Sequence, residues 1–175
     1  MTNLTLGNLL INFGHGSKVE KAAVLRANDH MKVYMDLTCF DPSEFYQEHP
    51  NLCGSFSALF CNETKKIEVH LKERNPGFNR KMEELGFTLI ETSVVSCGFV
   101  FPRTIVQIIN EAYYALGDKV AEREDINRAM KFGVNYPVGP FEWSEGKEQV
   151  VKTLLDELYK KTGDKRYLAC PLLDT

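Results

Sequence analysis

The sequence predicts an α/β domain over residues 1–97 followed by an all-helical domain over residues 98–175. Short apolar runs alternate with amphipathic stretches as far as Ser93, which is the pattern of a small, mostly parallel sheet covered by helices. From Phe101 onward, apolar residues recur at three- and four-residue steps, as buried helix faces require. The change of pattern near Ser96–Gly98 therefore marks the expected domain boundary.

In the first domain, strands are expected where apolar residues gather between turn residues, and helices where the apolar spacing lengthens. The expected strands are Leu9–Ile11, Met31–Leu37, Ser55–Phe60, Ile67–Leu71 and Phe87–Ser93. The expected helices are Lys18–Ala27, a short one starting near Asp41, and Arg74–Leu85, whose first turn tolerates Pro76.

The second domain is expected to contain a helical hairpin closed by a rigid corner. The first helix buries one face and stops at Gly117; that face comprises Ile105, Ile109, Ala112 and Leu116. The second helix opens with acidic residues near its positive end, and its inner stripe comprises Ile126, Ala129, Met130 and Phe132. Tyr136–Phe141 cannot be regular helix because its two prolines remove backbone donors. A further buried stripe follows over Val150–Leu158.

Composition excludes several classes of protein. The chain has 175 residues, 43% hydrophobic and 26% charged, with a formal net charge of −3, which argues against a nucleic-acid surface. No apolar run reaches membrane-spanning length, and no signal peptide is expected. Five scattered cysteines without a C-x-x-C motif indicate free thiols in a reducing cytoplasm and no metal site.

Several sequence blocks in the second domain carry a resemblance to a known family. They are GFVFPR (98–103), NEA (110–112), EDINRAMKFG (124–133), YPVGPFE (136–142) and LYKKTGDKRYLACPLL (158–173). In this order and spacing they resemble the C-terminal domain of 3-hydroxyacyl-CoA dehydrogenases. In that family the first domain is a much longer dinucleotide-binding fold. The resemblance therefore implies that residues 1–97 form a truncated, Rossmann-like sheet domain.

A dinucleotide fingerprint requires a glycine-rich turn between a strand and a helix, with an acidic residue further on for the ribose. Gly14 and Gly16 follow an apolar strand and precede a helix, and Asp36 lies twenty residues after Gly16. The third glycine is replaced by Val19, whose branched side chain is expected to push the helix off the sheet. Alternatively, residues 9–36 match a later part of the family domain, and the fingerprint is absent. NAD is thus a possible cofactor, and the absence of any cofactor is the favoured expectation.

Family members oxidise a 3-hydroxyacyl-CoA with a histidine base that is oriented by a glutamate. Gly54 and Glu68 have the spacing of the family's glycine and glutamate, fourteen residues apart, and Glu68 is the candidate catalytic residue. The histidine position is then Phe56, and a phenyl ring cannot accept a proton. His70, two residues beyond Glu68 on the same strand face, offers a rearranged pair as an alternative. The other histidines are expected in solvent.

Two further positions depart from the family pattern. The family asparagine near the active site corresponds to Pro102, and the family's Ser-Asn-Thr run is matched only loosely by Asp36–Thr38. We therefore expect a dehydrogenase-like protein that lacks dehydrogenase activity and binds an acyl-CoA. The alternatives are an active NAD-dependent dehydrogenase with a rearranged site, and a structural dimerisation module.

The resemblance also implies a homodimer through the helical domain. The side chains expected to pack between copies are Val106, Ile109, Tyr113 and Tyr114, since aromatic residues are favoured at interfaces.

Overall fold

The computed structural model describes residues 2–93 and 95–174. The chain divides into two compact units, Met1–Val100 and Phe101–Thr175, which meet a few residues beyond the expected boundary. Within the described ranges, no helix combines the length and apolar character that crossing a membrane requires.

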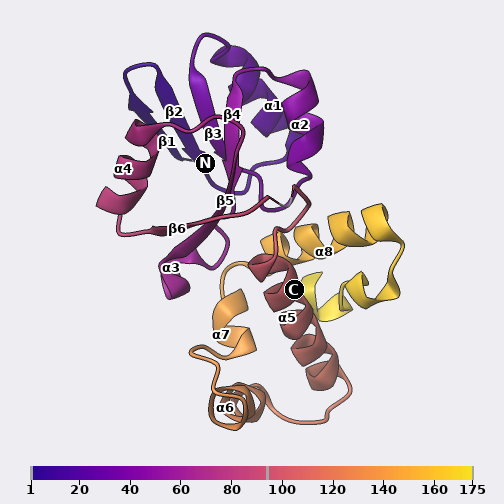
Figure 1. The fold of residues 1–175 in the computed structure, drawn as a ribbon. Coiled ribbons are helices and arrows are strands. Elements are labelled where there is room, and N and C mark those ends of the chain that lie inside the picture. The colour runs from indigo at the N-terminus through magenta and orange to yellow at the C-terminus, as the bar shows by residue number, and fades with distance from the viewer. Residues whose placement is uncertain (1, 94, 175) are drawn as a thin grey trace. The chain divides into compact units, whose positions relative to one another are not determined.

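The first unit is built on a six-stranded sheet whose strands follow one another in sequence order (Figure 1). The strands are β1 (Thr2–Leu6), β2 (Leu9–Phe13), β3 (Lys32–Asp36), β4 (Leu52–Phe56), β5 (Lys66–Leu71) and β6 (Thr88–Glu91). The β2–β3, β3–β4 and β5–β6 pairs are parallel, whereas β1–β2 and β4–β5 are antiparallel. The sheet is therefore mixed, and three of its five strand pairs are parallel.

Two elements of this sheet differ from the sequence prediction for local reasons. The strand β1 was not predicted, because four of its five residues are exposed and it has no buried apolar face. It joins β2 through a tight turn at Gly7, which has a φ of 59°. The strand β4 ends at Phe56 rather than Phe60, because the chain turns there into α3 (Cys61–Thr64).

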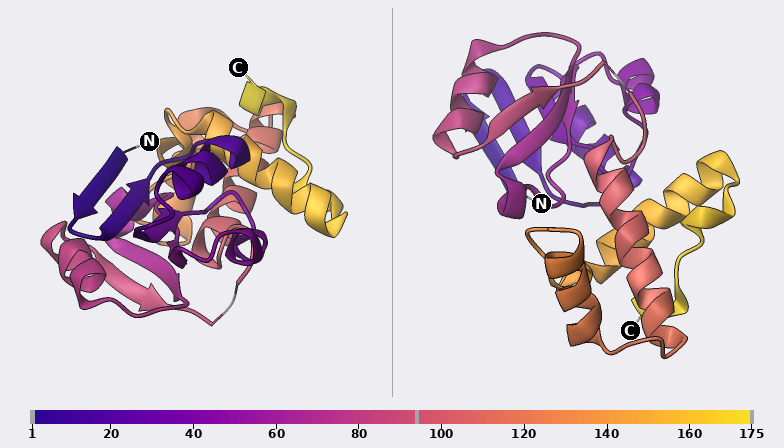
Figure 2. Two further views of the ribbon diagram at one scale, coloured as in Figure 1. Left: turned by 90° about the horizontal axis from the view of Figure 1, so that it is seen from above. Right: turned by 60° about the horizontal axis from the view of Figure 1, so that its bottom comes forward.

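Helices cover both faces of the sheet (Figures 1 and 2). The helices α1 (Lys18–Ala27) and α2 (Pro42–Glu48) connect parallel strands and lie on one face, as right-handed crossovers require. The helix α4 (Pro76–Glu84) covers the other face. There its buried Phe78 stacks on Tyr34 of β3, with 4.3 Å between the ring centroids. A Cβ atom at Gly54 would lie 2.7 Å from the Tyr34 ring, so only glycine fits beside this stack.

The second unit consists of helices: α5 (Phe101–Gly117), α6 (Arg123–Gly133), α7 (Pro140–Ser144), α8 (Glu148–Thr162), and the 3-10 turns η1 (Lys165–Tyr167) and η2 (Pro171–Asp174). The long helix α5 contacts α7, α8 and η2, and α6 contacts α7. The two helices predicted before the corner are present as α5 and α6. The corner is shorter than predicted: Pro140 and Phe141 are helical, because α7 begins at Pro140, where proline is favoured in a first helical turn.

The predicted inner stripe of α6 is only partly correct. No residue of α6 is fully buried. Ile126 and Met130 are half-buried, but Ala129 is exposed and 81% of Phe132 is exposed to solvent. The helix itself was predicted correctly. However, the face of α6 that contacts neighbouring helices is narrower than the four apolar residues suggested.

Candidate functional site

Polar side chains gather at the carboxyl ends of β2, β3 and β4, and Asp36 lies at their centre. Asp36 is 1% exposed. Its Oδ1 accepts hydrogen bonds from the Thr38 backbone N–H (3.1 Å), the Thr38 hydroxyl (2.6 Å) and the Ala58 N–H (3.4 Å). Its second oxygen, Oδ2, lies 3.4 Å from Nδ1 of His15, in the loop after β2. These donors hold the carboxylate in one orientation, with one oxygen left for His15.

A buried lysine approaches the same edge from α1. Lys21 is 1% exposed, and its Nζ donates to Oδ1 of Asn12 at 2.8 Å. The Asn12 amide in turn donates to Oδ1 of Asn3 at 2.6 Å. Burial lowers the pKa of Lys21, although the nearby Asp36 and Cys39 oppose this shift. The lysine therefore forms a satisfied polar chain beneath the edge of the sheet.

Backbone strain accompanies this polar edge. The Thr38 hydroxyl lies 3.0 Å from that of Ser57, and both residues are buried. Phe60, three residues after Ser57, has a φ of 67°, and Phe99 has a φ of 50°. Both phenylalanines are buried in a conformation that bulky residues rarely adopt. Such strain is often found at functional sites, where the surrounding packing holds it in place.

The position expected to hold the base is part of the apolar core. Phe56 is 0% exposed and faces α4. Its ring centroid lies 5.1 Å from that of Phe13 and 6.1 Å from that of Phe78. Glu68 lies on the opposite face of the sheet, because its neighbours Ile67 and Val69 belong to the same core as Phe56. Phe56 and Glu68 therefore do not come together.

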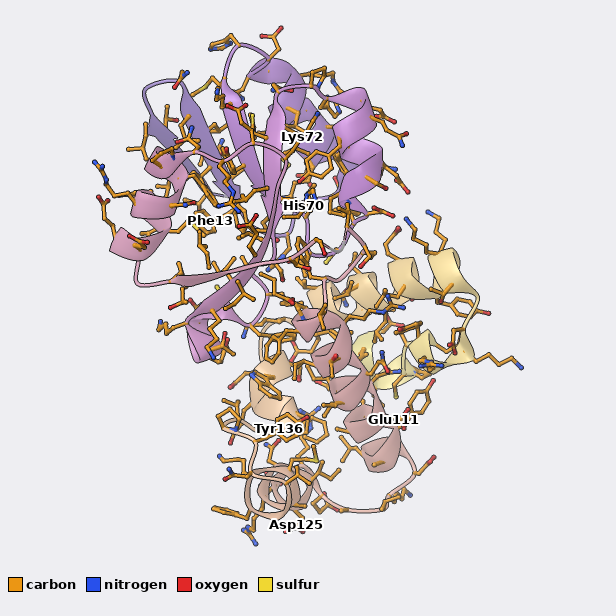
Figure 3. The ribbon with its side chains drawn as sticks, viewed as in Figure 1. Phe13, His70, Lys72, Glu111, Asp125 and Tyr136 are labelled. Carbon is orange, nitrogen blue, oxygen red and sulfur yellow. The ribbon has the colours of Figure 1, made fainter. Side chains whose placement is uncertain are left out.

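Glu68 and His70 are also engaged separately. Oε2 of Glu68 accepts a hydrogen bond from the Val100 N–H at 3.1 Å. His70 of β5 lies 3.0 Å through Nδ1 from the hydroxyl of Tyr46, which also donates to Ser55 (Figure 3). Burial lowers the pKa of His70 and raises that of Tyr46 to about 12. This cluster ties α2 to the sheet and engages one of the two ring nitrogens of His70.

The helix start predicted to receive a nucleotide phosphate already carries a carboxylate. Gly14 has a φ of 106° and forms a loop with Gly16 after β2. The Glu20 side chain folds back onto the start of α1, where its Oε2 accepts from the Ser17 backbone N–H (2.7 Å) and hydroxyl (2.9 Å). The Ser17 backbone bond in particular lowers the pKa of Glu20. A phosphate here would meet a negative charge in place of free N–H donors.

Strand order gives a second argument against a dinucleotide at this loop. Ligands of parallel α/β sheets bind where the strand order reverses. Here β2, β3 and β4 advance in one direction, and the other side of β2 is paired with β1. Asp36 is buried in its own turn, which does not suit a ribose contact. As they are placed here, the residues Gly14, Gly16 and Asp36 thus do not fit the dinucleotide fingerprint.

The steric objection raised for Val19 was wrong. Val19 is 74% exposed and points away from the sheet, so its branched side chain displaces nothing. What separates α1 from a phosphate-binding helix is the Glu20 cap. Within residues 2–93 and 95–174, no group of three or more His, Cys, Asp or Glu side chains could hold a metal ion.

Four contributors to the polar edge were missed from the sequence: His15, Lys21, Asn12 and Ser57. Each lies at or just beyond the carboxyl end of a strand, or on the helix that follows it. A polar residue ending an apolar strand, such as Asn12, was the available signal. His15 was instead expected in solvent, because its loop consists of turn-forming residues.

Comparison with known proteins shows what the helical unit is similar to. Residues 98–175 match the family model of the 3-hydroxyacyl-CoA dehydrogenase C-terminal domain. The 3-hydroxyadipyl-CoA dehydrogenase of Escherichia coli is 44% identical over 78 residues, which are 43% of this chain and 16% of that protein. The 3-hydroxybutyryl-CoA dehydrogenase of Clostridioides difficile is 42% identical over 80 residues, 45% of this chain and 28% of that protein. The chain therefore spans less than a third of these relatives' length.

Solved structures resemble nearly the whole chain. The (S)-3-hydroxybutyryl-CoA dehydrogenase of Ralstonia eutropha superposes with a TM-score of 0.75 at 20% identity, covering 95% of this chain and 64% of that one. The 3-hydroxybutyryl-CoA dehydrogenase of Escherichia coli K12 gives a TM-score of 0.64 at 24% identity, covering 98% and 32%. At these identities the likeness shows the fold.

A Rossmann-like sheet unit followed by this helical unit defines a dehydrogenase-type fold. The helical unit also matches in sequence, so residues 98–175 form a C-terminal domain of the 3-hydroxyacyl-CoA dehydrogenase type.

Proposed function

We propose that this protein is a 3-hydroxyacyl-CoA dehydrogenase-like protein of fatty-acid metabolism that binds an acyl-CoA and lacks dehydrogenase activity. Phe56 carries the proposal. It stands at the position expected for the base, is 0% exposed, and packs against Phe13 and Phe78. A phenyl ring neither accepts nor donates the proton that oxidation of a hydroxyl group must transfer.

The surroundings of Phe56 support the same conclusion. A histidine at this position would face α4 and the apolar core, whereas Glu68 lies on the other face of the sheet. Replacing one side chain would therefore not rebuild the base and its orienting carboxylate. We expect Phe56→His to show no gain of dehydrogenase activity.

The cofactor proposal follows from the same region. The likeness of the helical unit to 3-hydroxyacyl-CoA dehydrogenases makes NAD a candidate ligand. The carboxylate of Glu20 at the start of α1, the one-directional strand order and the burial of Asp36 argue against NAD at the loop after β2. We therefore propose that acyl-CoA binding is retained without hydride transfer.

Two titrations test this function. Acyl-CoA binding is measured by calorimetry with butyryl-CoA, and free CoA is the control for binding through the nucleotide part alone. NADH binding is followed by its fluorescence, and turnover by the oxidation of NADH with acetoacetyl-CoA. Binding of butyryl-CoA without NADH binding or turnover supports the proposal. Turnover that is lost in Glu68→Gln would show an active dehydrogenase instead.

We further propose that the helical unit forms a homodimer. Val106, Ile109 and Tyr113 are each at most 1% exposed in the single chain, which leaves Tyr114 as the accessible one of the four side chains expected at the interface. A groove of about 480 Å³ lies between α5 and α6; its apolar lining includes Ile108, Ala112, Ile126, Met130 and Pro140. Glu111 and Arg166 also line this groove.

A second copy of the helical unit suits this groove because it offers both apolar side chains and charges of both signs, as a self-complementary interface requires. Sedimentation or light scattering measures the assembly. We expect Ile108→Arg to give a monomer, whereas Val120→Arg, on an exposed residue that does not line the groove, leaves the assembly unchanged. A monomeric parent protein would contradict the proposal and leave a structural dimerisation role without support.

A cytoplasmic location is proposed from the thiols. All five cysteines lie in the described ranges, where they are buried and form no disulfide, as is usual for proteins kept in a reducing compartment. Fractionation of cells that produce the protein would test this.

A further inference from the structure

His15 and Asp36 form a pair at the carboxyl edge of the sheet that neither the family's chemistry nor the sequence prediction uses. Nδ1 of His15 lies 3.4 Å from Oδ2 of Asp36. The Asp36 side chain is 0% exposed, whereas 27% of the His15 side chain is exposed. A buried carboxylate behind a partly exposed imidazole is the arrangement that holds a histidine base in one orientation.

The carboxylate is fixed for this purpose by the chain around it. Oδ1 of Asp36 receives both bonds from Thr38 and one from the Ala58 N–H. Oδ2 is buried and has no hydrogen-bond partner among the described residues, although it faces His15. A buried carboxylate oxygen without a donor is costly. A donor N–H on Nδ1 of His15 would satisfy it with a small rotation of the ring.

This contact sets the chemistry of the other ring nitrogen. When Nδ1 carries the proton and faces Asp36, the lone pair of the neutral ring is on Nε2, at the opposite edge of the imidazole. Nε2 is then an acceptor on the partly exposed side of the residue. Phe13, two residues before His15 on β2, is only partly buried and lies on the core face above Phe56. The exposed part of Phe13 is thus an apolar surface two residues away from this acceptor.

We propose that His15, positioned by Asp36, accepts a hydrogen bond from the hydroxyl group of a 3-hydroxyacyl thioester. The inference rests on the acyl-CoA binding proposed above, and it adds the residue that would distinguish a hydroxylated acyl chain from an unsubstituted one. His15 lies on a different strand end from Phe56, so this pair does not restore the family's base. Asp36 acts through His15 and is a positioning residue.

Calorimetry with a matched pair of probes tests the inference. Butyryl-CoA and 3-hydroxybutyryl-CoA differ by one hydroxyl group, and one such hydrogen bond corresponds to a preference of about three- to tenfold for the hydroxylated thioester. We expect His15→Phe to lose this preference and to keep butyryl-CoA binding. His30→Phe, at a histidine whose side chain is 74% exposed, is the control and should keep the preference.

The possible failures are distinguishable. Equal binding of the two thioesters, or an unchanged preference in His15→Phe, overturns the inference and leaves acyl-CoA binding intact. Binding of neither thioester overturns the proposed function and the inference with it.

A second measurement does not depend on any ligand or variant. Long-range proton–nitrogen spectra distinguish the two neutral forms of a histidine ring. We expect the neutral ring of His15 to carry its proton on Nδ1, held by Asp36. A proton on Nε2 would place a donor where the proposal needs an acceptor, and would refute it.

Discussion

The helical unit and the sheet unit differ in how they resemble known 3-hydroxyacyl-CoA dehydrogenases. The helical unit matches in sequence over residues 98–175, whereas the chain as a whole shares only its fold with solved dehydrogenases, at identities of 20% and 24%. In the sheet unit, the position expected to hold the base is an apolar core residue, Phe56. The sequence likeness of this chain therefore concerns residues that pack the helices, and it gives little information about dehydrogenase activity.

Hydrogen bonds explain why the matching blocks occur together in the helical unit. Asn110 donates to the Leu168 carbonyl at 2.7 Å and accepts from the Cys170 N–H at 2.8 Å, which joins the NEA block to the last block. Oδ1 of Asn127 accepts from the Phe141 N–H at 3.0 Å, which joins the EDIN block to the corner.

A side chain at the corner would break this second contact. A Cβ atom at Gly139 would lie 2.3 Å from Oδ1 of Asn127, so glycine is required there. Arg103 of the GFVFPR block likewise donates through Nε to the Tyr167 hydroxyl at 2.7 Å. The blocks that identify the family are thus the contacts that hold the helices together.

Phe56→Ala should have the largest effect. Removing a fully buried ring from the sheet core lowers the free energy of unfolding by about 3–5 kcal/mol, through lost burial and a cavity. Urea unfolding followed by circular dichroism measures this. A change below about 1 kcal/mol would mean that Phe56 is not a core residue, and it would break the contrast between the units.

Asn110→Ala should have the next largest effect. It leaves the buried Cys170 N–H and the Leu168 carbonyl without their side-chain partner, at a cost of about 2–4 kcal/mol in the free energy of unfolding. Asn110→Asp keeps the acceptor for Cys170, but it places a carboxylate oxygen against the Leu168 carbonyl at a position that is 1% exposed, so it should also be destabilising. Thermal unfolding should rank the parent above both variants; equal stabilities would contradict the structural role of this block.

Tyr46→Phe should cost about 1–2 kcal/mol, because it removes the bonds to Ser55 and His70. Burial raises the pKa of Tyr46 to about 12. The unfolded chain therefore loses this proton first, and the stabilising effect falls as pH rises from about 10 towards 12. Unfolding curves of parent and variant should converge in that window. Tyr159→Phe, on a partly exposed residue of α8, is the control.

The same cluster has a second pH dependence at the acid end. Burial lowers the pKa of His70, so below its ordinary value of 6.5 the unfolded chain binds a proton that the folded chain does not. The free energy of unfolding should therefore fall as the solution is acidified through this region. Replacing His70 with Gln should flatten that part of the profile, and an unchanged profile would contradict this account.

Phe132→Ala should have the smallest effect, within about 0.5 kcal/mol, because 81% of this residue is exposed. It removes the same phenyl ring as Phe56→Ala, but from an exposed position in the helical unit. A loss comparable to that of Phe56 would show that α6 is covered in solution, which light scattering could then assign to the proposed dimer.

Much of the fold could be predicted from apolar spacing and turn residues. The strand at Leu9, the helix Lys18–Ala27 and the helices that became α5 and α6 were placed correctly, because apolar runs or apolar spacing are bounded by turn and cap residues there. The strand β1 has no buried face, and its pairing with β2 depends on tertiary contacts. The burial of Phe132 was predicted wrongly for a related reason, since a helical period does not say how wide the contacting face is.

The candidate site was harder to predict than the fold. The substitution at Phe56 was visible in the sequence, but the opposite orientations of Phe56 and Glu68 required the strand register. Likewise, the loop carrying His15 and the strand end carrying Asp36 are distant in sequence and become neighbours only through the parallel pairing of β2 and β3. The role of Glu20 as a helix cap is visible in the sequence, since Ser17 and Glu20 have the spacing of a capping box.

The hairpin strand β1 has a consequence for how this protein is handled in the laboratory. It occupies the outer side of β2, and Asn3 on it completes the amide chain that reaches Lys21 through Asn12. Trimming the first six residues would uncover a row of backbone donors and acceptors, which favours edge-to-edge aggregation. Shortened variants should therefore keep β1.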